Sequence, residues 1–302
     1  MWMHPWTLRE GFAISTGLTV AGILLELSLG RIEWSVFAWP VNVVVLLAFL
    51  MWVVVVHLLR SRVYAFRFLA TYRAAVPALA FAVVLTMVMG LMRQSEDGRW
   101  LHNMLSFWPF VLAYVYMVFI LGLVTLKRLQ QMTKCQPSVR RWMADLTFLL
   151  NHAGLFIALV AATLGSADVQ RLRMVVSVDG PERRAYDEQH RVIELPWAIG
   201  LKRFIMETYA DGSPKRYASE IEVLAPSGKT TLCTTEVNRP VKVGKWKIYQ
   251  YSYDTTMGAM SRISILELVR DPWLPVVYTG IGMLLAGAVG IFFLSNKTKQ
   301  IP

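Results

Sequence analysis

Long runs of apolar residues, almost free of charge, recur through the first half of the chain and once more near its end. Each run has about 20 residues, which is the length a helix needs to cross a hydrocarbon core of about 30 Å. These runs predict six membrane-spanning helices, at residues 11–30, 36–58, 74–92, 104–126, 148–166 and 273–294. The first run lacks a basic segment followed by a convincing cleavage site, so we interpret it as a span rather than a signal peptide.

Between the fifth and sixth predicted spans, apolar and polar residues alternate and Val, Ile and Tyr are frequent. This pattern is typical of half-buried strands. Strands are expected in EIEVL (220–224), TTEVNRPVKV (234–243), KWKIYQYSY (245–253) and RISILELV (262–269), with turns at ADGSP (210–214), APSG (225–228) and MGAM (257–260). The expected structure of this segment is a mostly antiparallel sheet or a small sandwich.

The fold class that follows is a polytopic α-helical membrane protein with a β-rich extracytoplasmic domain between its last two spans. We expect residues 1–166 to form a membrane domain of five helices and residues 167–271 to form the β-rich domain. Residues 272–302 then supply the final span and a short cytoplasmic tail. The last span carries Gly282, Ala286 and Gly290 four residues apart, a spacing of small side chains that favours close helix packing.

Charge gives the orientation. Only 17% of the residues are charged, against about 25% in a soluble domain. If the N-terminus is cytoplasmic, the inner connections hold twelve Lys and Arg residues and the short outer loops hold three. Because inner loops of membrane proteins are the more basic ones, both termini are predicted to be cytoplasmic. Residues 167–271 carry 16 basic and 14 acidic residues, so most of the net charge of +11 comes from the inner loops, and it does not indicate nucleic-acid binding.

The two cysteines, Cys135 and Cys233, are predicted to lie on opposite sides of the membrane and therefore cannot pair. The chain has no CxxC motif, so it offers neither a thioredoxin-like centre nor a covalent c-type haem attachment site. We interpret Cys233 as a small core residue. Hydrolase and ATPase motifs are also absent from the sequence, and no enzymatic activity is expected of this chain on its own.

The fifth predicted span contains an imidazole, His152, near its inner end. On a helical wheel Gly154 lies on a small-residue face, whereas Leu155 and Phe156 lie on the side of His152. An ionisable group at membrane depth indicates function unless it hydrogen-bonds a neighbouring helix, and both interpretations stay open for His152. As an axial ligand it would bind haem iron, with Leu155 and Phe156 packing against the porphyrin.

His57, near the inner end of the second span, is an alternative ligand or an interfacial residue beside an Arg-rich loop. His4, His102 and His190 are expected to be exposed. Glu26, in the outer part of the first span, is interpreted as interfacial rather than as a proton relay.

The series LPW (195–197), YADGSPKRYASEIEVL (209–224), EVNRPVKVGKWKIYQYSY (236–253) and DPWLPVVYTG (271–280) resembles the ResB family, also called CcsB, of System II cytochrome c biogenesis. Residues 1–130 match that family less specifically, and six spans exceed its usual four. The resemblance implies a subunit of a bacterial cytoplasmic membrane that moves haem b to the outer face with a CcsA (ResC) partner and presents it to apocytochrome c. It also implies that His152 is an axial ligand and that the partner supplies the second ligand and the attachment site. Because the chain ends soon after the last span, we expect the unfused half of this pair.

Two other functions compete with this interpretation. A b-type cytochrome subunit of a quinol-linked complex would need complete bis-histidine pairs, and His57 with His152 could form one. A signalling receptor would need a cytoplasmic output module, for which the short C-terminal tail leaves no room. Haem handling is therefore the expected function.

Overall fold

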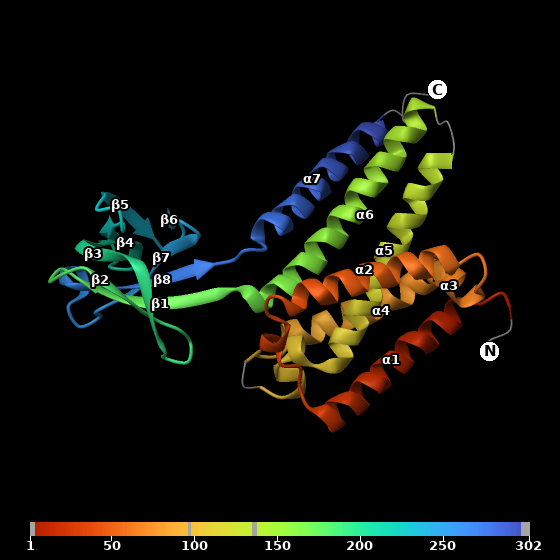
Figure 1. The fold of residues 1–302 in the computed structure, drawn as a ribbon, viewed down its shortest axis with the longest axis horizontal. Helices are drawn as coiled ribbons and strands as arrows, with labels where there is room; N and C mark the ends of the chain where they lie inside the picture. Colours follow the sequence, from red (N-terminus) through yellow and green to blue (C-terminus); the bar gives the residue numbers. More distant parts are fainter. Residues whose placement is uncertain (1–3, 96–97, 135–137, 297–302) are drawn as a thin grey trace. The chain divides into compact units, whose positions relative to one another are not determined.

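The computed structural model describes residues 4–95, 98–134 and 138–296, so Cys135 lies outside the described residues. The chain divides into two compact units, Met1–Ala167 with Trp273–Pro302, and Asp168–Pro272. Figure 1 shows the helices of the first unit and the strands of the second. Among the described residues, six helices are long and apolar enough to span a membrane. The predicted fold class, a polytopic helical membrane protein with a β-rich domain, is confirmed.

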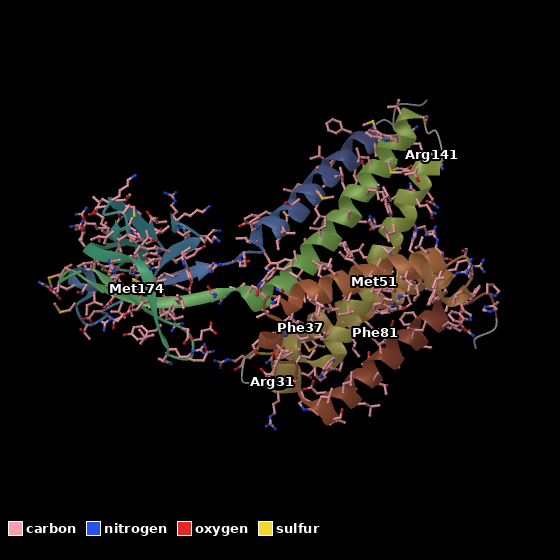
Figure 2. The ribbon with its side chains drawn as sticks, viewed as in Figure 1. Arg31, Phe37, Met51, Phe81, Arg141 and Met174 are labelled. Atoms are coloured by element: carbon pink, nitrogen blue, oxygen red, sulfur yellow. The ribbon has the colours of Figure 1, made fainter. Side chains whose placement is uncertain are left out.

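The first unit contains α1 (Leu8–Leu29), α2 (Val41–Leu59), α3 (Tyr64–Leu69), α4 (Tyr72–Leu91), α5 (Trp108–Lys134), α6 (Val139–Gly165) and α7 (Leu274–Asn296), with short 3₁₀ turns at Trp34–Phe37, Trp100–His102 and Met104–Ser106. Thr7 caps α1, since its hydroxyl oxygen accepts from the backbone N–H of Arg9 at 3.3 Å, and the Glu10 carboxylate accepts in return from the N–H of Thr7 at 2.7 Å. Apolar side chains such as Met51 of α2 and Leu285 of α7 are 65% exposed, as suits contact with hydrocarbon (Figure 2).

Helix α5 is the centre of this unit and packs against α1, α2, α4 and α6. It runs eight residues past the predicted end of its span, to Lys134, and α6 begins nine residues before its predicted start. The cause is that the spans were delimited by the first charged residues, whereas Lys and Arg are good helix formers that let a helix continue out of the hydrocarbon. Both extensions supply residues to the site described below.

Helices α6 and α7 pack closely through glycines. A Cβ atom built on Gly154 would lie 2.7 Å from the carbonyl oxygen of Gly280, and one built on Gly280 would lie 2.6 Å from the carbonyl oxygen of Gly154. Gly290 also faces α6, where it meets Thr147. The predicted stripe was wrong at its other positions, because Gly282 meets nothing within 4 Å among the described residues and Ala286 is exposed. The contact face of α7 is set by Gly280, Gly287 and Gly290.

The second unit is one antiparallel sheet of β1 (Gln170–Ser177), β2 (Glu182–Tyr186), β3 (Val192–Thr208), β4 (Pro214–Leu224), β5 (Thr230–Glu236), β6 (Val241–Val243), β7 (Trp246–Tyr253) and β8 (Ile263–Arg270). The strand order is β5-β4-β3-β2-β1-β8-β7-β6. The strands predicted at 220–224, 245–253 and 262–269 lie in β4, β7 and β8, and the 209–213 and 225–229 turns are present. The single strand predicted at 234–243 was wrong, because a turn closed by a hydrogen bond from Glu236 to Arg239 separates β5 from β6. MGAM forms a short 3₁₀ turn at Gly258–Met260. The sheet, rather than a sandwich, is the observed form.

The sheet curls over its own core. The Thr235 hydroxyl of β5 donates to the carbonyl oxygen of Ile248 in β7 at 2.6 Å, although these strands are far apart in the strand order. The concave face buries alternate residues of β1, including Met174, which is fully buried (Figure 2). Gln170 pairs with Arg270, so the first and last strands lie side by side at the centre of the sheet. The unit therefore begins and ends on neighbouring strands.

Candidate functional site: a basic, aromatic pocket around His152

His152 lies in α6, and Phe148, one turn earlier, determines how its ring is held. The Nδ1 atom of His152 is 2.9 Å from the carbonyl oxygen of Phe148. A carbonyl only accepts, so Nδ1 carries the proton, and Nε2 of the neutral ring carries the lone pair. Nε2 makes no hydrogen bond within the part of the chain that the structure describes. An imidazole that donates from one nitrogen to a carbonyl and keeps the other for a metal is the arrangement of metal-ligating histidines.

The Phe148 ring holds the imidazole from one side. The two rings are stacked, with centroids 3.7 Å apart and an angle of 14° between their planes. The guanidinium of Arg128 in α5 lies 5.2 Å from the centre of the Phe148 ring. Arg128 is in turn ion-paired with Asp145, a buried carboxylate one turn before Phe148. A chain of contacts thus runs from Asp145 through Arg128 and Phe148 to His152.

His152 and Phe148 line a pocket of about 730 Å³ in the helical unit. Pockets that bind small molecules measure roughly 300–1,000 Å³. The described lining consists of aromatic and apolar residues together with four cationic side chains: Pro5, Trp6, Tyr64, Arg67, Phe68, Ala70, Thr71, Tyr72, Arg73, Ala75, Val124, Lys127, Arg128, Gln131, Phe148 and His152. One wall comes from α5 and α6, and the other from α3, the start of α4 and the segment before α1.

The segment before α1 is fastened to the rim of this pocket. The backbone N–H of Trp6 donates to the Tyr64 hydroxyl at 2.8 Å, and the carbonyl oxygen of Trp6 accepts from Arg73 at 2.9 Å. The Trp6 ring meets Tyr64 and Phe68 edge-on, with centroids 5.3 Å and 5.2 Å apart. His4 is exposed and its ring packs on Tyr64. Residues that precede the first span therefore belong to the site.

His57 is buried in α2, but it is not among the described residues that line this pocket. Arg60 donates to its Nδ1 atom at 2.8 Å and also hydrogen-bonds Gln130 of α5. Because a guanidinium only donates, Nδ1 must accept, and the proton of the neutral ring is on Nε2. Neither ring nitrogen of His57 then has a lone pair to offer to iron. The structure does not bring the two membrane histidines to one site, and the ligand role of His57 stays a prediction.

Leu155 and Phe156 also lie outside the described lining of the pocket. Leu155 is 39% exposed. Phe156 packs between helices, because it stacks on Phe49 of α2 and lies against Gly122 of α5. Their predicted packing against a porphyrin stays a prediction, and in this pocket Phe148, Trp6 and Phe68 supply the aromatic surface.

The remaining residues singled out from the sequence, His102, His190, Glu26 and Cys233, are either exposed or contribute to helix capping and core packing. His102 and His190 are exposed, as expected. The Glu26 carboxylate accepts from the N–H of Trp108 at 3.2 Å and so caps α5. Cys233 packs against the core of the sheet, and burial raises the pKa of its thiol, which keeps it protonated and unreactive. No group of three or more His, Cys, Asp or Glu side chains that could hold a metal ion occurs within the described ranges.

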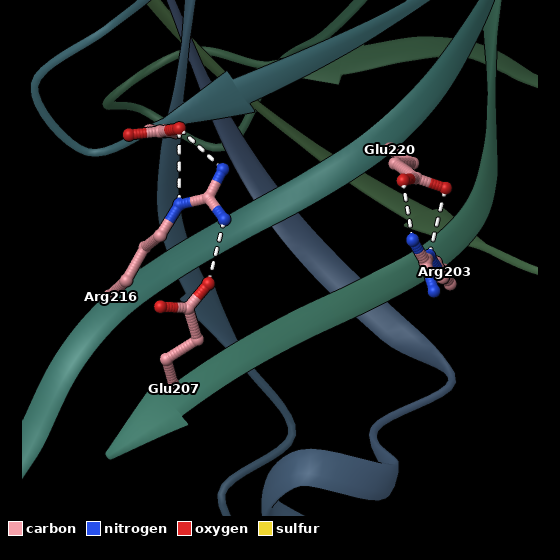
Figure 3. Close-up of polar contacts among 5 residues, drawn as sticks. Arg203, Glu207, Arg216 and Glu220 are labelled. Atoms are coloured by element: carbon pink, nitrogen blue, oxygen red, sulfur yellow. Dashed lines mark hydrogen bonds and ion pairs between the residues drawn. The ribbon is translucent and has the colours of Figure 1, made fainter. Parts of the chain in front are cut away.

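Charged residues of the 209–224 motif stabilise the hairpin of β3 and β4. Arg216 bridges Glu207 and Glu236 at 2.8 Å and 2.6 Å, and Arg203 binds Glu220 with two hydrogen bonds (Figure 3). These guanidinium groups lower the pKa values of Glu207 and Glu220. Gly212 has a φ of +80°, which a turn residue without Cβ adopts readily. This part of the motif is explained by strand pairing.

Sequence reasoning identified His152 and missed its surroundings. An ionisable residue in an apolar run is visible in the sequence, and Phe148 could have been found from its spacing of one turn. Trp6, Tyr64, Arg73 and Lys127 carry no such signal, because each joins the site only when separate helices pack together.

Comparisons with known proteins agree with the expected family. Residues 140–264 match the ResB-like family, a segment that includes most of α6, with His152, and β1 to β7. A search of curated proteins gives no match. One solved structure with similarity is described as "Cytochrome c Heme Lyase CcmF", with 12% identity and a TM-score of 0.38, over 96% of this chain and 46% of that one. The chain thus spans about half the length of that protein.

Proposed function

Because residues 140–264 of this membrane protein match the ResB-like family, we propose that the chain handles haem during cytochrome c maturation and that His152 is an axial ligand of the transported haem. Haem is the cargo in this proposal. The partner is a CcsA/ResC-type membrane protein, and the recipient is apocytochrome c.

The observation that supports the proposal best is the hydrogen bonding of the His152 imidazole, which leaves one ring nitrogen uncommitted in the described part of the chain. Its Nδ1–H is engaged by the carbonyl oxygen of Phe148, and its Nε2 lone pair is uncommitted within the described residues, in a side chain that lines an aromatic pocket. Iron of a porphyrin needs one such nitrogen on each face, and the porphyrin body needs apolar surface. A second ligand from a partner chain would complete the coordination.

The residues of the site have separate roles in this function. His152 provides the lone pair, Phe148 fixes the tautomer and the ring orientation, and Trp6 and Phe68 contribute apolar surface. With the more basic loops in the cytoplasm, the pocket lies toward the cytoplasmic side, where haem would enter. The β-rich unit is then extracytoplasmic in a bacterial cytoplasmic membrane, on the side where apocytochrome c is matured.

The test is the absorption spectrum of the protein purified with its partner from the membrane. Wild type is expected to show a reduced b-type haem spectrum, which His152→Gly loses and added imidazole restores, because free imidazole replaces the deleted ligand. His57→Gly is the matched control and should keep the spectrum.

One outcome would contradict the assignment of His152 as a ligand, and another would contradict the role in haem delivery. An unchanged spectrum in His152→Gly would make His152 a packing residue. Loss of the spectrum in both variants would instead favour a haem held between His57 and His152, as in a b-type cytochrome subunit.

A further inference from the structure

The pocket around His152 contains more positive charge than its own residues neutralise. Of its four cationic side chains, Arg128 is ion-paired with Asp145. Arg67, Arg73 and Lys127 have no carboxylate partner among the described residues. Arg73 and Lys127 are partly buried, where a cation without a counter-charge is costly, and Arg67 is exposed at the rim of the pocket. The pocket is therefore suited to an anionic ligand.

Arg73 and Lys127 are held in place by neutral groups. Arg73 donates to the carbonyl oxygen of Trp6 at 2.9 Å and to the Tyr72 hydroxyl at 3.4 Å, which uses two of its five N–H donors. Lys127 donates to the carbonyl oxygen of Ala70 at 2.9 Å and has three N–H donors in all. Each side chain is thus oriented by a carbonyl but keeps its charge and further donors.

Arg67, in α3, is the third cation of the pocket that lacks a carboxylate partner among the described residues. Its guanidinium lies 5.0 Å from the centre of the Tyr64 ring, an aromatic contact that leaves its charge uncompensated. Tyr64 also accepts from Trp6, so the ring and the guanidinium belong to the same rim of the pocket. A ligand that fits this arrangement has an apolar body and more than one anionic group.

We propose that Arg67, Arg73 and Lys127 bind the two propionate carboxylates of the porphyrin, so that this pocket selects its cargo by carboxylates as well as by iron. The inference rests on the proposed function, because it concerns the same ligand. It assigns recognition of the porphyrin edge to residues outside the segment that matches the ResB-like family.

The experiment measures the contribution of the carboxylates to porphyrin binding in the absence of iron. The full-length protein in nanodiscs of zwitterionic lipid is titrated with metal-free protoporphyrin IX and with its dimethyl ester, and binding is followed by porphyrin fluorescence. The free acid is expected to bind at least about tenfold more tightly than the ester, since a charge-assisted hydrogen bond supports a difference of that size.

Substitutions then test which residues cause the preference for the free acid over the ester. The triple variant Arg67→Gln/Arg73→Gln/Lys127→Gln should bind acid and ester alike. The control Arg62→Gln/Arg140→Gln/Arg141→Gln removes three exposed cations that do not line the pocket, and it should retain the tenfold preference. The preference should also persist in His152→Gly, because His152 acts on iron.

Equal binding of acid and ester by the wild type would overturn the inference, and so would loss of the preference in the control variant alone. Anionic phospholipid in the nanodisc that displaces the free acid from wild type but not from the triple variant would show that a lipid phosphate occupies the cations, and would also overturn it. An acid preference together with a haem spectrum that does not depend on His152 would leave the inference standing and contradict the ligand assignment.

Discussion

At the scale of single residues, the chemistry of the His152 imidazole is determined by Phe148 and by what Phe148 contacts. The backbone of Phe148 sets which nitrogen is protonated, and its ring sets the plane of the imidazole. Arg128, held by Asp145, lies over the same ring. In its neutral form, the imidazole of His152 thereby becomes an oriented donor of one lone pair.

Replacing Phe148 should separate these two effects. Phe148→Leu keeps the backbone carbonyl but removes the ring, so we expect a haem dissociation constant about 2–10-fold higher, as the loss of an aromatic pair worth about 0.5–1.5 kcal/mol predicts. Phe148→Tyr retains the stacked ring and is the control. Haem titration of the purified complex measures both variants, and equal affinity in Phe148→Leu and wild type would show that the ring has no positioning role.

At the scale of elements, α6 is joined to α7 by direct backbone contact and to α5 by the site residues. Gly154 and Gly280 leave no room for a side chain between the helices. This contact lies two residues beyond His152 along α6, so the helix that carries His152 is supported on the face away from the pocket. The pairing of α6 with α7 is thus part of what keeps the site in position.

Two glycines of α7 provide a matched test of this packing. Gly280→Ala would place its Cβ 2.6 Å from a carbonyl oxygen, and we expect a loss of about 1–3 kcal/mol of stability from overpacking. Gly282→Ala, where nothing lies within 4 Å among the described residues, should be neutral or slightly stabilising. Thermal unfolding in detergent compares the two, and a similar effect of both substitutions would contradict the contact.

The same scale explains which strands were predicted. The predicted strands in β4, β5, β7 and β8 alternate apolar and polar residues, because one face of each strand is buried. β2 (Glu182–Tyr186) buries only Ala185 among charged and polar neighbours, and β3 contains Pro196 and Gly200 within its 17 residues. Both strands are specified by pairing with their neighbours, which leaves little trace in the sequence pattern.

At the scale of the whole molecule, the positive charge of the connections determines orientation in the membrane. Arg62 and Ser213 are exposed in the connection after α2 and in the turn between β3 and β4. If the basic connections are cytoplasmic, these two positions face opposite sides of the membrane.

Cysteine labelling tests this orientation in cells. In a chain carrying Cys135→Ser and Cys233→Ala, Ser213→Cys should react with a membrane-impermeant maleimide in intact cells. Arg62→Cys should react only after the cells are lysed, because the bilayer separates it from the reagent. The reverse pattern would show that the termini are extracytoplasmic and would move the pocket to the other side of the membrane.

The sequence by itself determined the number of spans, the presence of a β-rich insertion, the similarity of residues 140–264 to the ResB-like family and the choice of His152 as the ligand candidate. These features depend on local composition and periodicity, which can be read along the chain. Only the tertiary structure decided the tautomer of His152, the separation of His57 from it, and the set of Trp6, Arg67, Arg73 and Lys127 around one pocket. The physical reason is that side chains from α3, α4, α5 and the N-terminal segment meet only through helix packing, and that packing depends on contacts between residues far apart in sequence.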